Sequence, residues 1–429
     1  MYSKVEYLRR WRDDLASLRV RERRPIGPFT ARQLSSPGTE QSADTFQLGV
    51  GNQWGAHDAE YRLEGEFEIP ETWRGGLLAL QLDLASPLHQ WAINTAEGLV
   101  ELDGHPFHAV DRYHREILLP PEISATPRHS LSMKLWAGIH ETNHSVHTLE
   151  LRLLDPAIDC LRLQLMLLLD ALEQLPETSP AHVALLTALQ DATVLLYHAE
   201  RHTPAFARSC QAALDLLEER WWKPQREQTQ TQPTWQPQVT ATGHAHIDVA
   251  WLWRLRHSRR KAADTFSTAL YHMDRYPFFV FTQSQPQLYQ FVKEDEPELY
   301  ERIKQKVAAG QWEPEGAMWV ESDTNLPGGE SLVRQFLFGQ RFFRQEFGRT
   351  CKVLWLPDVF GYSPAMPQLM QGAGVEYFVT TKLSWNDTNR MPFDTFWWEG
   401  LDGSQVLAYF ITAQNSGDQY YTYNAEMKP

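Results

Sequence analysis

The chain has 429 residues, more than one ordinary domain holds, so two or three domains are expected. Its 42% hydrophobic content supports a buried core and excludes a disordered or fibrous protein. The formal net charge of −14 argues against binding to nucleic acid, which requires a clustered basic face. The one basic run, residues 254–261, is predicted to lie on a helix with its charges in solvent.

Cysteine usage and hydropathy indicate in which cellular compartment the protein is expected. The three cysteines form no CxxC pair, so the sequence predicts neither a disulfide framework nor a thiolate zinc site. Residues 1–24 lack the apolar segment of a signal peptide, and the most apolar stretch, 161–169, is too short to span a bilayer. We therefore expect a soluble, cytoplasmic protein that does not act at a membrane. Formation of a homo-oligomer is left open.

The first half of the chain changes pattern twice. Residues 1–25 are expected to form an amphipathic N-terminal helix. Short apolar runs divided by Pro, Gly and polar turns occupy 26–155 and are typical of an all-β module, a sandwich. From 156 to 226 the leucines recur at three to four residues, which indicates a helical segment. The strand candidates are 77–84, 91–94, 131–135 and 148–153, and helices are expected from residue 161 onward, near 182–199 and near 205–219.

The second half begins after a linker. Residues 228–238 are rich in Gln, Thr and Pro without a period, which predicts that linker. From 235 to 429 strand-like and helix-like segments alternate, and this favours a parallel sheet covered by helices, either a barrel or a doubly wound sheet. The strand candidates are 239–243, 278–282, 311–319, 353–356, 377–381, 395–398 and 406–411, and the helix candidates are 259–274, 296–309, 330–347 and 365–372.

Five of these strands end in polar residues. Because the carboxyl ends of parallel strands meet on one face of the fold, the five ends are expected to build one site. His246 and Asp248 alternate in an extended segment, so both side chains point the same way, as two ligands of a divalent metal must. The alternative is that they cap a strand and the following helix. Asp358 lies before a turn and is a candidate nucleophile, base, third ligand or turn cap.

Tryptophans follow the same strand ends. They are Trp251, Trp253, Trp385, Trp397 and Trp398. Flat rings beside carboxylates suit a sugar substrate, because aromatic faces stack on apolar sugar faces. Packing beneath the loops is the alternative, and we favour it for at least one of Trp397 and Trp398, which alternate in one strand.

Four runs resemble glycoside hydrolase family 38 α-mannosidases, especially the cytosolic and vacuolar branch. They are GHAHIDVAWLW at 243–253, GQWEPEGAMWVESDTNLPGGESLVRQFLFGQRFF at 310–343, WLPDVFGYS at 355–363 and TKLSWNDTN at 381–389. The runs occur in the family's order, and the close likeness extends over about 235 to 415. Residues 26–222 resemble more loosely the β-module and helical segment that precede the catalytic domain in that branch.

The resemblance implies a seven-stranded parallel α/β barrel that hydrolyses terminal α-linked mannose from oligosaccharides with retention. It implies one divalent metal ion, zinc or cobalt, bound by His246, Asp248 and Asp358. Asp358 would also be the nucleophile. Trp251 and Phe360 would line the sugar subsite.

Two parts of the family's site have no counterpart here. The fourth ligand is a histidine after the nucleophile, whereas the last histidine of this chain is His272. The family's general acid is also unmatched, and Glu321, Asp323 and Asp387 are equal candidates. We therefore expect a fragment whose barrel is incomplete. The alternatives are a truncated or vestigial mannose-binding protein without turnover, or another metal-dependent carbohydrate hydrolase such as a deacetylase. In a smaller departure, Ala317 stands where the family often has glycine.

Overall fold

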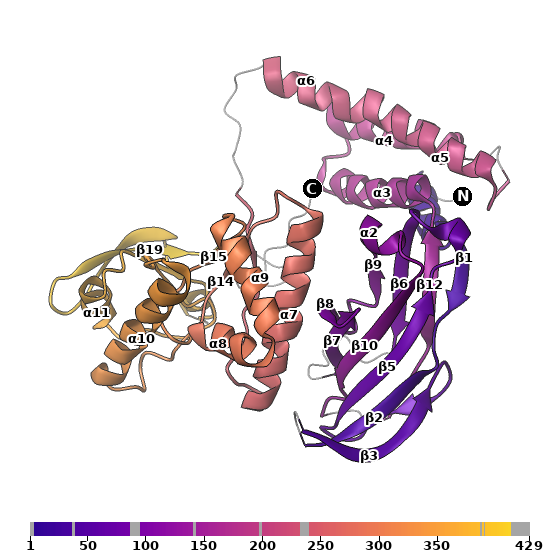
Figure 1. Cartoon of the computed structure of the whole chain (residues 1–429). Helices are drawn as coiled ribbons and strands as arrows, with labels where there is room; N and C mark the ends of the chain where they lie inside the picture. Colours follow the sequence, from indigo (N-terminus) through magenta and orange to yellow (C-terminus); the bar gives the residue numbers. More distant parts are fainter. Residues whose placement is uncertain are drawn as a thin grey trace.

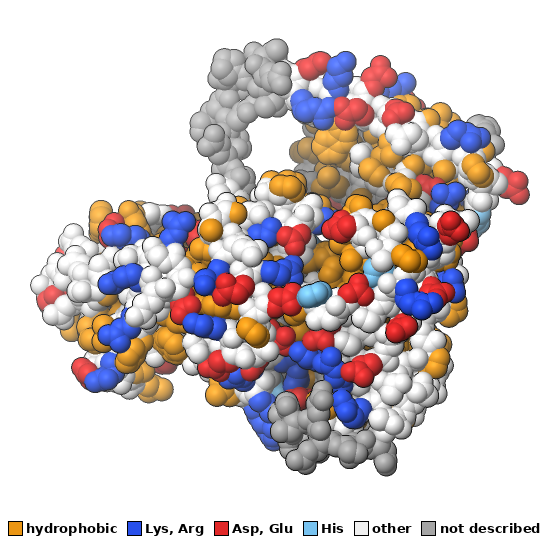
Figure 2. Space-filling view, viewed as in Figure 1, with side chains coloured by type: hydrophobic (Ala, Val, Ile, Leu, Met, Phe, Trp, Pro, Cys, Tyr) orange, Lys and Arg blue, Asp and Glu red, His pale blue; other side chains and the backbone are white. Residues whose placement is uncertain are grey.

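The computed structural model describes residues 4–36, 39–85, 95–139, 143–196, 200–231, 240–386, 388–389 and 391–412 (Figure 1). A β-rich module comes first, a layer of helices lies across one end of it, and an α/β region follows. Within the described ranges, every helix is too short or too polar to cross a bilayer. On the face drawn in Figure 2, basic and acidic side chains are interspersed across the surface.

The N-terminal helix is shorter than the sequence pattern predicted. Helix α1 (Lys4–Leu18) buries Leu8 and Trp11 on one face, and the chain then extends into strand β1 (Val20–Pro25). The expectation of one helix over 1–25 is therefore wrong for residues 19–25, of which 20–25 form a strand. Strand β1 pairs antiparallel with β12 (Thr148–Leu154), and this distant partner supplies the backbone hydrogen bonds that a continued helix would have supplied.

The β-rich module is a sandwich, as the sequence predicted. Its first sheet has the order β1-β12-β6-β9 and its second the order β3-β2-β5-β10-β7-β8, all antiparallel. Apolar residues of both sheets form one core, in which Leu63 and Met133 meet Leu80 and Leu151. The candidate strand 91–94 lies outside the described residues. The strands not yet bounded are β2 (Phe29–Ser36), β3 (Thr39–Leu48), β5 (Glu60–Glu68), β6 (Leu77–Asp83), β7 (Glu97–Leu102), β8 (His105–Val110), β9 (Glu116–Leu118) and β10 (Arg128–Trp136).

The helical segment contains α3 (Pro156–Gln174), α4 (Pro180–Val194) and α5 (Pro204–Leu217). Each begins with proline after a residue whose side chain accepts from the first free N–H groups, the pattern that defines a helix start. A π-helical turn (Glu218–Trp222) then leads into α6 (Lys223–Thr231), so the predicted linker begins later than residue 228. Residues 232–239 are not described.

The α/β region has parallel strands in chain order. Strands β13 (Gly243–His244), β14 (Phe281–Gln283) and β15 (Trp312–Pro314) form one sheet, and β16 (Val353–Trp355), β17 (Tyr377–Thr380) and β19 (Gln405–Phe410) belong to a second. A parallel bridge between Gly316 and Leu354 joins the two sheets. This sequential order is typical of a barrel and differs from a doubly wound sheet, where the order reverses.

One strand of this region departs from the parallel prediction. Strand β18 (Thr395–Glu399) pairs antiparallel with β19. Only residues 400–404 connect the two strands, which is too short for the helical crossover that parallel neighbours need. The described strands thus form two bridged sheets, one of them mixed.

Helices cover these sheets close to where the sequence placed them. They are α7 (Leu255–Arg275), α8 (Pro286–Asp295), α9 (Pro297–Ala308), α10 (Gly329–Phe347) and α11 (Met366–Gly372), and only α8 was not predicted. Their core centres on Trp312, whose Nε1 donates to the Tyr289 hydroxyl at 2.8 Å.

Helix α7 lies between this core and the β-module (Figure 1). Its Tyr271 belongs to the core of the module, where the hydroxyl donates to the Leu118 carbonyl at 2.9 Å. The basic run is only partly in solvent, which corrects the prediction: the Arg254 side chain is 67% exposed, whereas those of Arg260 and Lys261 are largely covered. Arg260 pairs with Glu60, and Lys261 Nζ lies 2.6 Å from Glu97 Oε1.

Candidate metal centre

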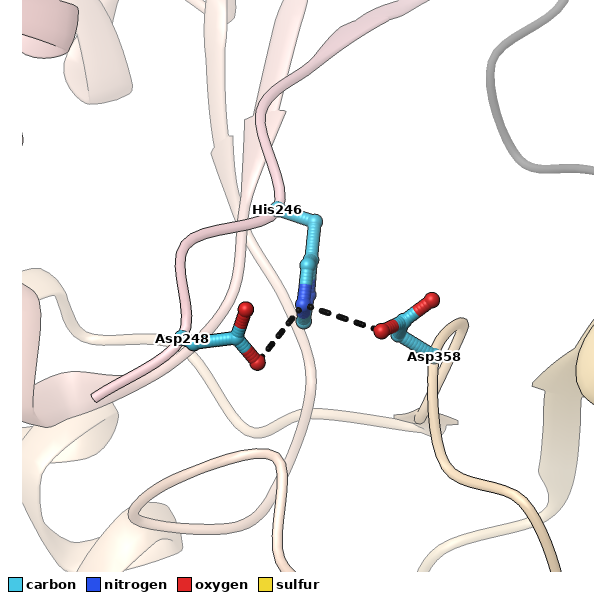
Figure 3. A group of neighbouring side chains, drawn as sticks. All are labelled: His246, Asp248 and Asp358. Carbon is cyan, nitrogen blue, oxygen red and sulfur yellow. Dashed lines mark hydrogen bonds and ion pairs between the residues drawn. The ribbon is translucent and has the colours of Figure 1, made fainter. Parts of the chain in front are cut away.

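Three predicted ligands converge at the carboxyl ends of two strands. His246 and Asp248 follow β13, and Asp358 follows β16. One ligand atom from each lies within 4.8 Å of the other two (Figure 3). His246 Nε2 is 3.2 Å from Asp248 Oδ1 and 3.7 Å from Asp358 Oδ2. The structure therefore brings together an imidazole nitrogen and two carboxylates, a donor set that zinc and cobalt accept.

The orientation of His246 is fixed from behind by Glu321. Nδ1 of His246 lies 2.5 Å from Glu321 Oε2, and the other oxygen of Glu321 accepts from Ser284 Oγ at 2.5 Å. With its Nδ1–H donated to Glu321, a neutral ring presents the Nε2 lone pair to the two aspartates. This backing carboxylate is typical of metal-bound histidines. Glu321 is buried in that role, which sets it apart from Asp323 and Asp387, the other two candidates for the general acid.

The electrostatic field at this point favours a positive charge. Burial lowers the pKa of His246, but its hydrogen bonds to Asp248 and Glu321 outweigh burial and raise the pKa to about 10. A cation that binds Nε2 must displace that proton. Cation affinity is therefore expected to fall as the pH falls.

Lys382 is a member of the site that sequence reasoning left without a role. It follows β17, the neighbour of β16, and its Nζ lies 2.8 Å from Asp358 Oδ1. The same ammonium group lies 3.9 Å from the ring centroid of Trp385 and 4.9 Å from that of Phe360. The signal available in the sequence was the strand-end position beside the strand that carries Asp358.

The comparisons with known proteins agree on this half of the chain. Residues 236–429 match the sequence model of the glycosyl hydrolases family 38 N-terminal domain. This part of the chain belongs to glycoside hydrolase family 38. Alpha-mannosidase G of Dictyostelium discoideum is 49% identical over 213 residues, which are 50% of this chain and 19% of that protein. Alpha-mannosidase 2C1 of Homo sapiens is 52% identical over 181 residues, which are 42% of this chain and 17% of that protein.

The chain thus spans about a fifth of the length of these relatives. Among solved structures, an alpha-mannosidase from Enterococcus faecalis V583 aligns at 23% identity with a TM-score of 0.34. That alignment covers 39% of this chain and 19% of the other.

The remaining predicted residues of the family 38 domain separate into exposed and structural groups. Trp251 is 59% exposed and Phe360 is 64% exposed, so both rings are open to a ligand. Asp323 accepts from the N–H groups of Asn325 and Leu326 at 2.7 and 2.9 Å and so holds a turn. Asp387 lies outside the described residues.

Trp398 and Trp253 have structural roles, as the packing alternative predicts, but Trp397 does not. Trp398 packs against Phe378 with ring centroids 5.0 Å apart, whereas Trp397 on the other face of β18 is 66% exposed. Trp253 donates its Nε1–H to the Asp248 carbonyl at 3.1 Å. It therefore supports the loop that carries a predicted metal ligand.

Proposed function

We propose that this family 38 chain belongs to a retaining α-mannosidase that removes terminal α-linked mannose from oligosaccharides. The observation that carries the proposal is the convergence of His246, Asp248 and Asp358 on one point. The relatives that share this half of the chain are named alpha-mannosidases, which supports the substrate class. In this proposal the parallel strands in chain order belong to a seven-stranded barrel.

His246, Asp248 and Asp358 would hold one divalent cation, zinc or cobalt. When bound there, the cation would supply Lewis-acid and template chemistry to the hydroxyl groups of the sugar. Asp358 would attack the anomeric carbon and form the glycosyl-enzyme, with Lys382 orienting its carboxylate from the other side. Trp251 and Phe360 would contact the apolar face of the sugar.

Retention also requires a second carboxyl group about 5 Å from the nucleophile, which protonates the leaving oxygen and then activates water. Glu321 is committed to His246 and Asp323 to its turn. The proposal therefore assigns the general acid to neither of them. A cytoplasmic location is supported by the three cysteines, all of which are free.

The test is hydrolysis of an aryl α-mannoside by the 429-residue chain with zinc or cobalt added and with chelator as a control. Metal-dependent release of the aryl group that is nearly lost in Asp358→Asn and retained in the control Asp323→Asn would support the proposal. Proton NMR of the first product should show the α-anomer. Turnover close to that of the wild type in Asp358→Asn would refute the assignment of the nucleophile.

A further inference from the structure

The β-module and the metal centre are linked through one buried carboxylate. Asp58 lies just before β5 and is 8% exposed. Its oxygens accept from Trp136 Nε1 at 3.0 Å and from His257 Nε2 at 2.7 Å. They also pair with Arg254 at 3.1 Å and with Arg256. A carboxylate of the module thus collects four donors, three of which come from the first turn of α7 or the residue before it.

His257 transmits this contact to the start of α7. Its Nδ1 accepts the Arg254 N–H at 3.1 Å, so the proton of the neutral ring is on Nε2 and is donated to Asp58. In this tautomer the 3.2 Å approach of Arg256 Nε to Nε2 is not a hydrogen bond. The ring is buried and stacks on Trp136 at 4.2 Å. Burial lowers the pKa of His257 to about 4, which keeps the ring neutral near pH 7.

The same turn of α7 holds the segment that carries Asp248. Ser258 Oγ donates to the Asp248 carbonyl at 3.2 Å, and Trp253 Nε1 donates to that carbonyl at 3.1 Å. Trp251 and Leu252, between these ties, are both more than half exposed. Val249 packs against the apolar core, but Trp251 and Leu252 have little apolar cover, so the hydrogen bonds to the Asp248 carbonyl and to the Arg254 amide restrain the rest of this segment.

We propose that Asp58 is a positioning residue for the metal centre: through His257 it fixes the first turn of α7, and that turn fixes Asp248. This gives the β-module a scaffolding role. Its consequence for cation binding rests on the proposed function, whereas the mechanical tie does not. Outer partners of metal ligands commonly change metal affinity by about 10- to 100-fold.

The same interface provides a matched control. Glu60 is 12% exposed and pairs with Arg260, one turn further along α7. Its loss removes an ion pair between the same two parts of the chain but breaks no contact with His257 or Arg254. Glu60→Gln therefore reports the cost of a weakened interface without the tie to the 248–254 segment.

Hydrogen exchange of the 429-residue chain measures the tie directly, because the Arg254 amide is protected by His257. In Asp58→Asn the peptide spanning 249–258 should exchange on the order of tenfold faster than in the wild type, the size expected for losing a hydrogen bond to a charged group. In Glu60→Gln it should not change. Equal exchange in the two variants would overturn the proposal. If Asp58→Asn fails to fold, His257→Gln breaks the same tie from the helix side and should give the same result.

Cobalt binding, followed by visible absorption, tests the consequence. The dissociation constant should rise about tenfold in Asp58→Asn and stay near the wild-type value in Glu60→Gln. Faster exchange without a change in cobalt affinity would refute positioning of the metal centre. Failure of the wild-type chain to bind cobalt would refute the metal centre itself, while the exchange experiment would still decide whether Asp58 holds the loop.

Discussion

The substitution Gly339→Ala should destabilise the chain although it lies inside a helix. Alanine in a helix interior is normally about 1 kcal/mol more stable than glycine. In α10, however, a Cβ at position 339 would lie 2.2 Å from the Ala317 carbonyl oxygen and 2.6 Å from the Met318 carbonyl carbon. Both are backbone atoms, so no side-chain rotation relieves the contact. Ala317 is buried and already has a left-handed φ of 67°, which restricts the loop further.

The expected magnitude follows from two opposing effects. Overpacking of a well-packed interior costs about 1–3 kcal/mol, and contacts this short with backbone belong near the upper end. After the helix propensity of about 1 kcal/mol is subtracted, a net loss of about 2 kcal/mol remains. The displaced loop is also tied to α10, because Trp319 N–H donates to the Gln335 carbonyl at 3.0 Å. The same loop continues to Glu321, which orients the predicted ligand His246, so cobalt affinity should fall as well.

Urea unfolding followed by tryptophan fluorescence measures the loss. The control is Gly372→Ala at the end of α11, where an added Cβ meets no atom within 4 Å. That variant should be more stable by about 0.5 kcal/mol. The close approach of α10 to the loop would be refuted if Gly339→Ala were as stable as the wild type or more so.

Three further predictions concern titratable groups. Burial raises the pKa of Asp264, whose carboxyl oxygens have no hydrogen-bond partner among the described residues, so the folded state loses stability as pH rises above the usual aspartate range. Asp264→Asn should therefore stabilise the chain at pH 7 but not at pH 4 in urea unfolding, and an equal effect at both would contradict this. Burial lowers the pKa of His108 to about 4, so the unfolded chain gains the proton first. Stability should fall between pH 6.5 and 4, by about 3 kcal/mol from this group, and His108→Gln should flatten that slope. Lys382→Met removes a positive charge 2.8 Å from Asp358 and should tighten cobalt binding while lowering turnover; weaker binding would count against the ion pair.

Much of the site could be predicted because it depends on local rules. The common edge of parallel strands put His246, Asp248 and Asp358 on one face, and the resemblance to family 38 grouped them as one ligand set. The features that escaped prediction depend on distant partners. Strand β1 exists because β12 lies beside it, and Lys382 contacts Asp358 because β16 and β17 are neighbours. The basic run of α7 reads as a solvated face until the acidic residues of the β-module are placed against it.

The border of the family match does not coincide with the border between the two hydrophobic cores, because helix α7 contributes to both. The family match begins at residue 236, yet α7 within it contributes Tyr271 to the interior of the preceding module. A segment cut at the family border would leave that ring without its apolar surroundings and Leu118 without its hydrogen bond. Recombination that exchanged the module for an unrelated one would face the same mismatch. Separating the two regions would therefore expose apolar surface that each covers on the other.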